Sequence, residues 1–476
     1  MILGVRERLI EATRLRLRAD VPVGIYLSGG IDSSLLAGIA TQLVHEQGVK
    51  MGNVDGTKRI CCFSVEFPQE SGCNESDIAE RTADWLGVQI HKKRMDEAEI
   101  ARHFADAAYH CEHHNFDLNS VGKYALSTVP RERGFKVVLT GEGSDEHFGG
   151  YPFFIADHLR EPDLALPVSP PAADPRLREA LHRGAESDMR AVFERAGSFN
   201  RDWRETDSVR AVGGSMMLSC IAAVMPETTL FAPWVRRDLA GADCRDTIVG
   251  GLTPEARRKI AEKWHPLHTA EYLWSRTMLL NNLLSCLGDR TEMAHSIEAR
   301  PPFLDHVVSE YINGLPPSVK IAYEPGRAAR NVKEGGQVGM WWRAGSEGAT
   351  GGGGSAFEAF TEKWILREAG KPFITQELYE RRKHPYTAPL RWPRGGPLES
   401  MFAGLLTREA VGKLGFVDYE VVADALGRGF GDESDPKAFR TLIFVASWVV
   451  IGERFGVKTA GREESWAASG KGSMGK

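Results

Sequence analysis

The feature that most constrains the fold is a short Gly-rich loop between an apolar segment and a helical one. The apolar segment is residues 23–27, and the loop after it reads Ser28-Gly29-Gly30-Ile31-Asp32-Ser33-Ser34. Apolar residues then recur at helical spacing from about residue 33 to 45, and Gly48 is a typical helix end. Glycines let backbone N–H groups approach an anion, while serine hydroxyls and the start of a helix add donors. The loop therefore predicts a phosphate-binding turn at the end of a strand.

Asp32 lies within this loop, where its carboxylate would repel a phosphate. The repulsion disappears if Asp32 holds a magnesium ion that bridges to the phosphates. The loop has neither the GxxxxGK[ST] spacing of a Walker A loop nor the GxGxxG spacing of a dinucleotide-binding turn. A tight strand-to-helix turn with a capping Asp or Ser stays open as the alternative.

Short β-branched runs alternate with helical patterns over residues 21–150, which is typical of an α/β fold. We expect a parallel sheet flanked by helices, because strands separated by helices cannot pair as hairpins. Residues 1–150 would form this phosphate-binding core. The further elements that we expect are strands at residues 59–65, 88–90 and 136–140 and a helix at residues 76–86.

The rest of the chain predicts three further regions. Residues 151–275 show long helical patterns after a Pro-rich loop and would form an additional helical insertion. Residues 276–460 would complete the main domain, with a turn-rich apolar stretch at 297–304 and a Gly-rich loop at 323–355. Residues 461–476 are typical of a disordered tail.

Composition excludes several classes of partner. The net charge is −5 and the pI about 6.3, which disfavours a nucleic-acid binder. No apolar run approaches the roughly 20 residues of a membrane span, so no membrane is expected. The seven cysteines are scattered without a CxxC pair, which favours a reduced, cytoplasmic protein.

Four segments together resemble a known family. The loop resembles the PP-loop (SGGxDS) of N-type ATP pyrophosphatases. Three later segments read Gly-Glu-Gly-Ser-Asp-Glu-His-Phe-Gly-Gly-Tyr at residues 141–151, Asp-Arg-Thr-Glu-Met-Ala-His-Ser-Ile-Glu-Ala-Arg-Pro-Pro-Phe-Leu-Asp at 289–305, and Lys-Trp-Ile-Leu-Arg-Glu-Ala with Arg-Arg-Lys-His-Pro-Tyr within 363–386. In this order they resemble the synthetase domain of glutamine-dependent asparagine synthetases, whose fold is adenine nucleotide alpha hydrolase-like.

The resemblance implies an ATP-dependent carbon–nitrogen ligase. A carboxylate, by default that of aspartate, would attack the α-phosphate of ATP and release pyrophosphate. Ammonia would then attack the acyl-adenylate, giving asparagine and AMP.

The resemblance also implies a role for particular residues. Asp32 and Asp145 would hold Mg²⁺, and Glu142 would accept a proton from the attacking amine. Lys383 would stabilise charge during adenylation, and Glu292 falls where β-lactam-forming members place a second catalytic carboxylate. The residues expected to contact ATP are Leu27, Ser28, Gly29, Gly30, Asp32, Ser33, Ser34, Val65 and Gly141.

The sequence departs from the family in two places. The loop appears by residue 28, which leaves no room for the family's N-terminal glutaminase domain. We therefore expect free ammonia, another amine or a separate glutaminase subunit as the nitrogen source, unless the chain is part of a longer protein. The stretch at residues 112–119 lacks the Arg that would fix the α-carboxylate of aspartate.

Several alternatives therefore stay open. One is a specialised-metabolism ligase of the same fold that forms another amide or a lactam. Another is a subunit that binds nucleotide without turning it over. The resemblance also leaves a homodimer open as the assembly. The Glu298 and Arg300 side chains are expected to form an ion pair that holds a turn, and the His-rich residues 110–114 a solvated or substrate-facing loop.

Overall fold

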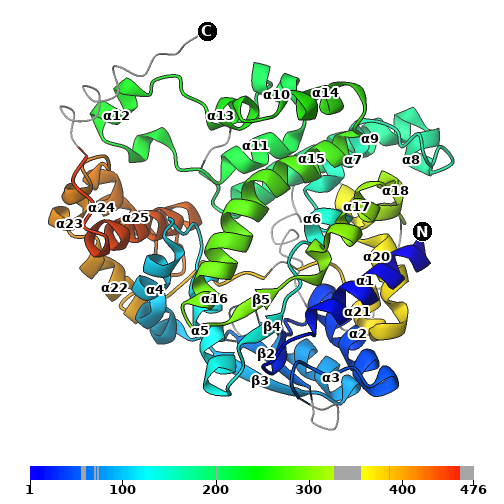
Figure 1. Ribbon diagram of the computed structural model, residues 1–476. Coiled ribbons are helices and arrows are strands. Elements are labelled where there is room, and N and C mark those ends of the chain that lie inside the picture. Colours follow the sequence, from blue (N-terminus) through cyan, green and yellow to red (C-terminus); the bar gives the residue numbers. More distant parts are fainter. Residues whose placement is uncertain are drawn as a thin grey trace.

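The computed structural model describes residues 1–54, 60–68, 71, 74–199, 202–325, 355–384 and 386–460. Its centre is a five-stranded parallel sheet with the order β3-β2-β1-β4-β5 (Figure 1). The strands are β1 (Val23–Tyr26), β2 (Cys61–Glu66), β3 (Gln89–Arg94), β4 (Val137–Leu139) and β5 (Glu298–Arg300). The predicted α/β class and parallel sheet are confirmed.

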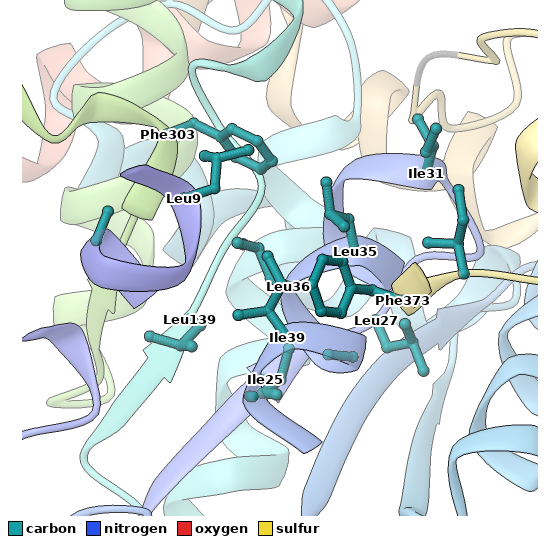
Figure 2. Packing of buried hydrophobic residues seen from close by; sticks show 14 of the residues in the cluster. Leu9, Ile25, Leu27, Ile31, Leu35, Leu36, Ile39, Leu139, Phe303 and Phe373 are labelled. Carbon is teal, nitrogen blue, oxygen red and sulfur yellow. The ribbon is translucent and has the colours of Figure 1, made fainter. Parts of the chain in front are cut away.

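Helices cover both faces of the sheet, because successive strand residues point to opposite sides. On one face, Ile25 and Leu139 pack against α2 (Ile31–Gln47), as Figure 2 shows. On the other face, Tyr26 and Val138 pack in a second cluster with α5 (Asn119–Glu132). The expected helix at residues 76–86 is α3 (Ser76–Leu86).

The fifth strand corrects the prediction of a turn-rich stretch at residues 297–304. Residues 298–300 pair with β4 at the edge of the sheet. Glu298 and Arg300 flank a single alanine, so the segment has no apolar alternation to mark it as a strand. Their predicted ion pair is present, with Nε 2.8 Å from Oε1, but it lies along this edge strand.

A mainly helical layer follows the first four strands. Its helices include α7 (Phe154–Arg160), α9 (Pro175–Arg195), α11 (Met216–Ala223) and α15 (Pro266–Trp274), which share one apolar core. Phe357 and Phe360 belong to the same core, so the layer packs against a segment much later in the chain. The proposed domain boundaries therefore stay a prediction.

The segment after α15 is a π-helix, η3 (Ser275–Arg290). It continues α15 and leads into α16 (Thr291–Met293). Together, α15 and η3 form the long helix that crosses the front of the molecule in Figure 1. A π-helix is rare and is frequently found at a functional site. The sequence predicted a helix here but not its wider turn.

The last helices form a fourth apolar core. α22 (Pro397–Leu405), α24 (Tyr419–Arg428) and α25 (Pro436–Arg454) pack with α4 (Glu97–Cys111), which the sequence places in the first third of the chain. Most of the predicted Gly-rich loop at 323–355 and the predicted tail at 461–476 lie outside the described residues. None of the helices that the structure describes has both the length and the apolar character of a membrane span.

Candidate active site

The Gly-rich loop connects β1 to α2 at the carboxyl end of the sheet. Gly29 has a φ of 78°, and a Cβ there would lie 2.8 Å from the Glu75 carbonyl oxygen. Both observations require glycine, because a side chain would be strained and crowded. The Ser28 and Ser33 hydroxyl oxygens lie 3.1 Å apart across the loop. The loop is therefore a tight turn whose hydroxyls face one another at the start of a helix.

Two carboxylates and two ammonium groups meet beside this loop. The Lys363 Nζ lies 2.6 Å from Asp32 Oδ1 and 2.6 Å from Asp145 Oδ1. The Lys383 Nζ lies 2.7 Å from Asp145 Oδ2, and the Ser144 hydroxyl donates to Asp32 Oδ1 at 2.7 Å. We call Asp32, Asp145, Lys363 and Lys383 the four-charge cluster. The structure thus brings together the predicted Asp32, Asp145 and Lys383.

Electrostatics keeps Asp32 and Lys383 of this cluster ionised. Burial raises the pKa of Asp32, but the Lys363 and Lys383 ammonium groups outweigh burial and bring the pKa to about 2. Burial lowers the pKa of Lys383, but Asp145 and Asp32 raise it above the usual range of a lysine. Two negative and two positive charges therefore balance in a buried position, which is how buried charges are tolerated.

A second cluster of charged side chains lies around Lys123. Lys123 Nζ donates to Glu142 Oε1 and to Glu292 Oε1, both at 2.9 Å. The same ammonium lies 4.8 Å from the centre of the Tyr26 ring. We call Lys123, Glu142 and Glu292 the lysine–diglutamate cluster. It joins the predicted Glu142 and Glu292 through a lysine that the sequence did not single out.

The two glutamates of this cluster differ in their pKa. Burial raises the pKa of Glu142, but Lys123 and a hydrogen bond from Thr140 hold it below the ordinary value. Burial raises the pKa of Glu292 to about 6, against the attraction of Lys123 and with the help of the Glu142 charge. Burial lowers the pKa of Lys123, but both glutamates raise it well above the usual range. Lys123 is therefore a cation, and Glu142 is the more acidic carboxyl.

One cavity of about 400 Å³ is lined by Asp32, Asp145 and Lys383 of the first cluster and by Lys123 and Glu142 of the second. Its walls come from the carboxyl ends of the strands, from the helical layer and from η3. The predicted site residues that line it are Leu27, Ser28, Asp32, Ser33, Val65, Gly141, Glu142, Asp145 and Lys383. Glu292 reaches the cavity only through Lys123, while Gly29, Gly30 and Ser34 shape the turn behind its surface.

Lys363 is the residue of the four-charge cluster that sequence reasoning missed. It is fully buried and precedes α20 (Trp364–Gly370) with a φ of 55°. A Cβ on Gly150 would collide with Lys363 Cε and Asp145 Oδ1, so this glycine makes room for the ammonium. The signal was present, since Lys363 begins one of the four matched segments and Gly150 lies within another.

The His-rich residues lie at the end of α4 and do not converge. Glu112 follows the helix with a φ of 52°, and the His114 ring stacks on Phe444 at 4.6 Å. Among the residues that the structure describes, no group of three or more His, Cys, Asp or Glu side chains is arranged as a metal site.

Comparison with known proteins agrees with the geometry of the site. An amidase of Penicillium rubens, ChyE, is 40% identical over 97% of this chain and 63% of its own length. An amidase of Gibberella zeae, Chry2, is 39% identical over 96% of this chain and 62% of its own length. A glutamine-hydrolyzing asparagine synthetase of Bacillus subtilis is 23% identical over 82% of this chain and 50% of the relative. The chain therefore spans less than two thirds of the length of these relatives.

The family assignment rests on a match along nearly the whole chain. Residues 4–449 match the asparagine synthase family, and this range includes the loop and both charged clusters. The chain belongs to the asparagine synthase family.

Proposed function

We propose that this protein activates a carboxylate with ATP and transfers the acyl group to ammonia or an amine. The observation that carries the proposal is the pairing of two clusters in one cavity. The four-charge cluster suits a triphosphate, and the lysine–diglutamate cluster lies next to it with an ionised carboxylate.

The first step forms an acyl-adenylate. A carboxylate oxygen of the substrate attacks the α-phosphorus, the bond to the bridging oxygen of the β-phosphate breaks, and pyrophosphate leaves. Lys363 and Lys383 would exchange their carboxylate partners for phosphate oxygens and stabilise the charge that develops there. The loop hydroxyls and the first N–H groups of α2 would hold the remaining oxygens.

Asp32 and Asp145 fit a magnesium ion. Mg²⁺ usually takes one or two protein carboxylates and completes its shell with phosphate oxygens and water. Asp32 is ionised, and both carboxylates face the same lysine from neighbouring loops. Bound Mg²⁺ would neutralise charge on the phosphates, and it stays a proposal of this site.

The second step forms the amide. The nitrogen attacks the acyl carbon, the bond from that carbon to the phosphate oxygen breaks, and AMP leaves. Glu142 would accept the proton that the nitrogen loses, because its pKa is held low beside Lys123. Lys123 would orient Glu142 and stay protonated throughout.

The carboxylate and the nitrogen source stay predictions. Aspartate is the default from the asparagine synthetases, whereas the two relatives with the higher identity carry the name amidase. We favour the specialised-metabolism alternative. Ammonia or a separate glutaminase subunit would supply nitrogen.

Product analysis tests the proposal. The protein would be incubated with MgATP, ammonium and a panel of carboxylates, and nucleotides would be separated by chromatography. We expect AMP and pyrophosphate in equal amounts, with an amide formed from one carboxylate of the panel. Release of ADP would contradict the mechanism, and binding of ATP without turnover would favour the non-catalytic subunit.

A further inference from the structure

The charged groups line only part of the cavity, and another part of its wall is apolar. This wall comes from the helical layer, from η3 and from the turn after α4. Its rings and its thioether belong to Phe116, Phe153, Phe193, Phe199, Trp274 and Met278. Binding against an apolar wall is favourable because it removes apolar substrate surface from water. Aromatic side chains in such a wall favour flat rings.

The π-helix contributes Asn282 and three apolar side chains to the cavity wall. Met278, Leu283 and Leu287 line the cavity at intervals of five and four residues. Each N–H of a π-helix bonds to the fifth carbonyl before it, so residues four and five apart share a face. The wider turn is therefore what presents these three side chains together.

Two of the cationic side chains that line the cavity, Lys123 and Lys383, are paired with carboxylates. Lys123 holds two glutamates, and Lys383 belongs to the four-charge cluster. Arg440 donates from Nε to the Ala196 carbonyl at 2.8 Å and from Nη1 to the Phe116 carbonyl at 2.6 Å. A second carboxylate on the substrate would therefore have to share Arg440, whose guanidinium makes no ion pair with a described residue but already donates to two carbonyls.

Neutral polar groups are nevertheless available in the same wall. Asn115 is 4% exposed, and its Nδ2 has no hydrogen-bond partner among the described residues. The Ser198 hydroxyl is equally buried and equally unpartnered. Buried donors without partners are rare, and a polar atom of a ligand is one way to satisfy them.

We infer that the activated acid has a ring, an apolar body and a neutral polar group, and is not aspartate. This inference rests on the proposed adenylating function. The carboxylate would lie between the two clusters, the ring against Phe193 and Trp274, and the polar group toward Asn115.

Two stable mimics of the acyl-adenylate separate this inference from the proposed function. One carries a 3-phenylpropanoyl group on sulfamoyl adenosine, and the other carries an L-aspartyl group on the same scaffold. Their dissociation constants and that of AMP would be measured by calorimetry with the full chain. We expect the phenylpropanoyl mimic to bind at least roughly tenfold more tightly than the aspartyl mimic. The burial of one ring contributes more binding free energy than a tenfold difference in affinity requires.

A pair of variants locates the effect. Phe193 and Leu181 both lie on α9 and pack half-buried against the same apolar core, but only Phe193 lines the cavity. Phe193→Ala should weaken the phenylpropanoyl mimic by about tenfold and leave the aspartyl mimic unchanged, because it removes a ring contact. Leu181→Ala should change neither constant, and circular dichroism would confirm that both variants fold.

Each remaining outcome has a distinct meaning. If the aspartyl mimic binds as tightly as the phenylpropanoyl mimic or more tightly, the inference is overturned and the proposed function survives. If neither mimic binds more tightly than AMP, the cavity holds no acyl group and both fail.

Discussion

Glu142 and Glu292 share one ammonium group, yet their pKa values move in opposite directions. The lower pKa of Glu142 suits a carboxylate that accepts a proton, and the pKa of about 6 at Glu292 suits one that responds to pH. Environments that push the pKa values of two neighbouring carboxyls apart commonly mark an acid–base site.

Glu142→Gln should separate the two half-reactions. The amide cannot accept a proton, so amide formation should fall by about 10²–10⁴-fold. Carboxylate-dependent ATP–pyrophosphate exchange should persist, because it ends before the nitrogen attacks. Glu298→Gln is the matched control, since its exposed ion pair lies on the edge strand and both activities should be unchanged. Equal loss of both activities in Glu142→Gln would assign the residue to folding or to ATP binding.

Glu292 predicts an acidic limit on amide formation. Protonation below a pH of about 6 removes its attraction for Lys123, so the rate should rise with pH through this value. The ratio of wild-type to Glu292→Gln rates isolates the effect, because the ionisation of ammonium is common to both.

The raised pKa of Glu292 also means that the native state binds more protons than the unfolded state between pH 4.5 and about 6. This group's contribution to stability therefore falls as pH rises through that window, and Glu292→Gln should lack the slope.

The sequence predicted the site residues that lie within Gly- and Ser-rich motifs, but it did not predict Lys123 or Lys363. Asp32, Glu142 and Asp145 sit among glycines and serines whose spacing already suggests a phosphate site. Lys123 looks like an ordinary lysine, and Lys363 is marked only by its place at the start of a matched segment, because nothing local shows that either is buried. Only tertiary packing removes them from water, and packing was not visible in a single sequence.

At the level of elements, Asp157 ties two helices of the layer together. Its buried carboxylate accepts from the Ser215 hydroxyl at 3.0 Å and from the Met216 and Met217 N–H groups at 2.9 and 3.1 Å. These groups begin α11, so the side chain on α7 satisfies N–H groups that a helix start leaves unpaired.

Asp157→Ala should leave these buried donors without partners and lower the free energy of unfolding by about 3 kcal/mol or more. Denaturant unfolding would measure the change. The control is Asp207→Ala, because the Asp207 side chain is 98% exposed and its ion pair with Arg210 should contribute less than about 1 kcal/mol. Similar losses in the two variants would contradict this role of Asp157.

Element prediction succeeded where periodicity is strong and failed where it is weak. The helix at residues 76–86 matches α3, and α2 ends at the left-handed Gly48. β5 has three residues and one neighbouring strand, so its sequence carries no pattern. The π geometry of η3 is set by how its side chains pack, which propensity does not encode.

At the level of the whole molecule, the cavity joins the sheet, the helical layer and η3, so a ligand there should stabilise all three. MgATP at roughly 100 times its Kd should add about 2.7 kcal/mol to the free energy of unfolding. Asp32→Asn should abolish this increment, whatever it does to the stability of the free protein, while Asp207→Asn should retain it. Denaturant midpoints with and without nucleotide would measure both, and an unchanged increment in Asp32→Asn would remove Asp32 from the ATP site.

The four-charge cluster has a consequence for synthesis on the ribosome. Asp32 and Lys363 are 331 positions apart, and Arg6 donates to the Ala369 carbonyl across 363 positions. While the chain is being translated, the two aspartates emerge long before either lysine that neutralises them. The nascent sheet would therefore carry uncompensated negative charge at its ligand edge, and activity can arise only when the last quarter of the chain folds back on the first.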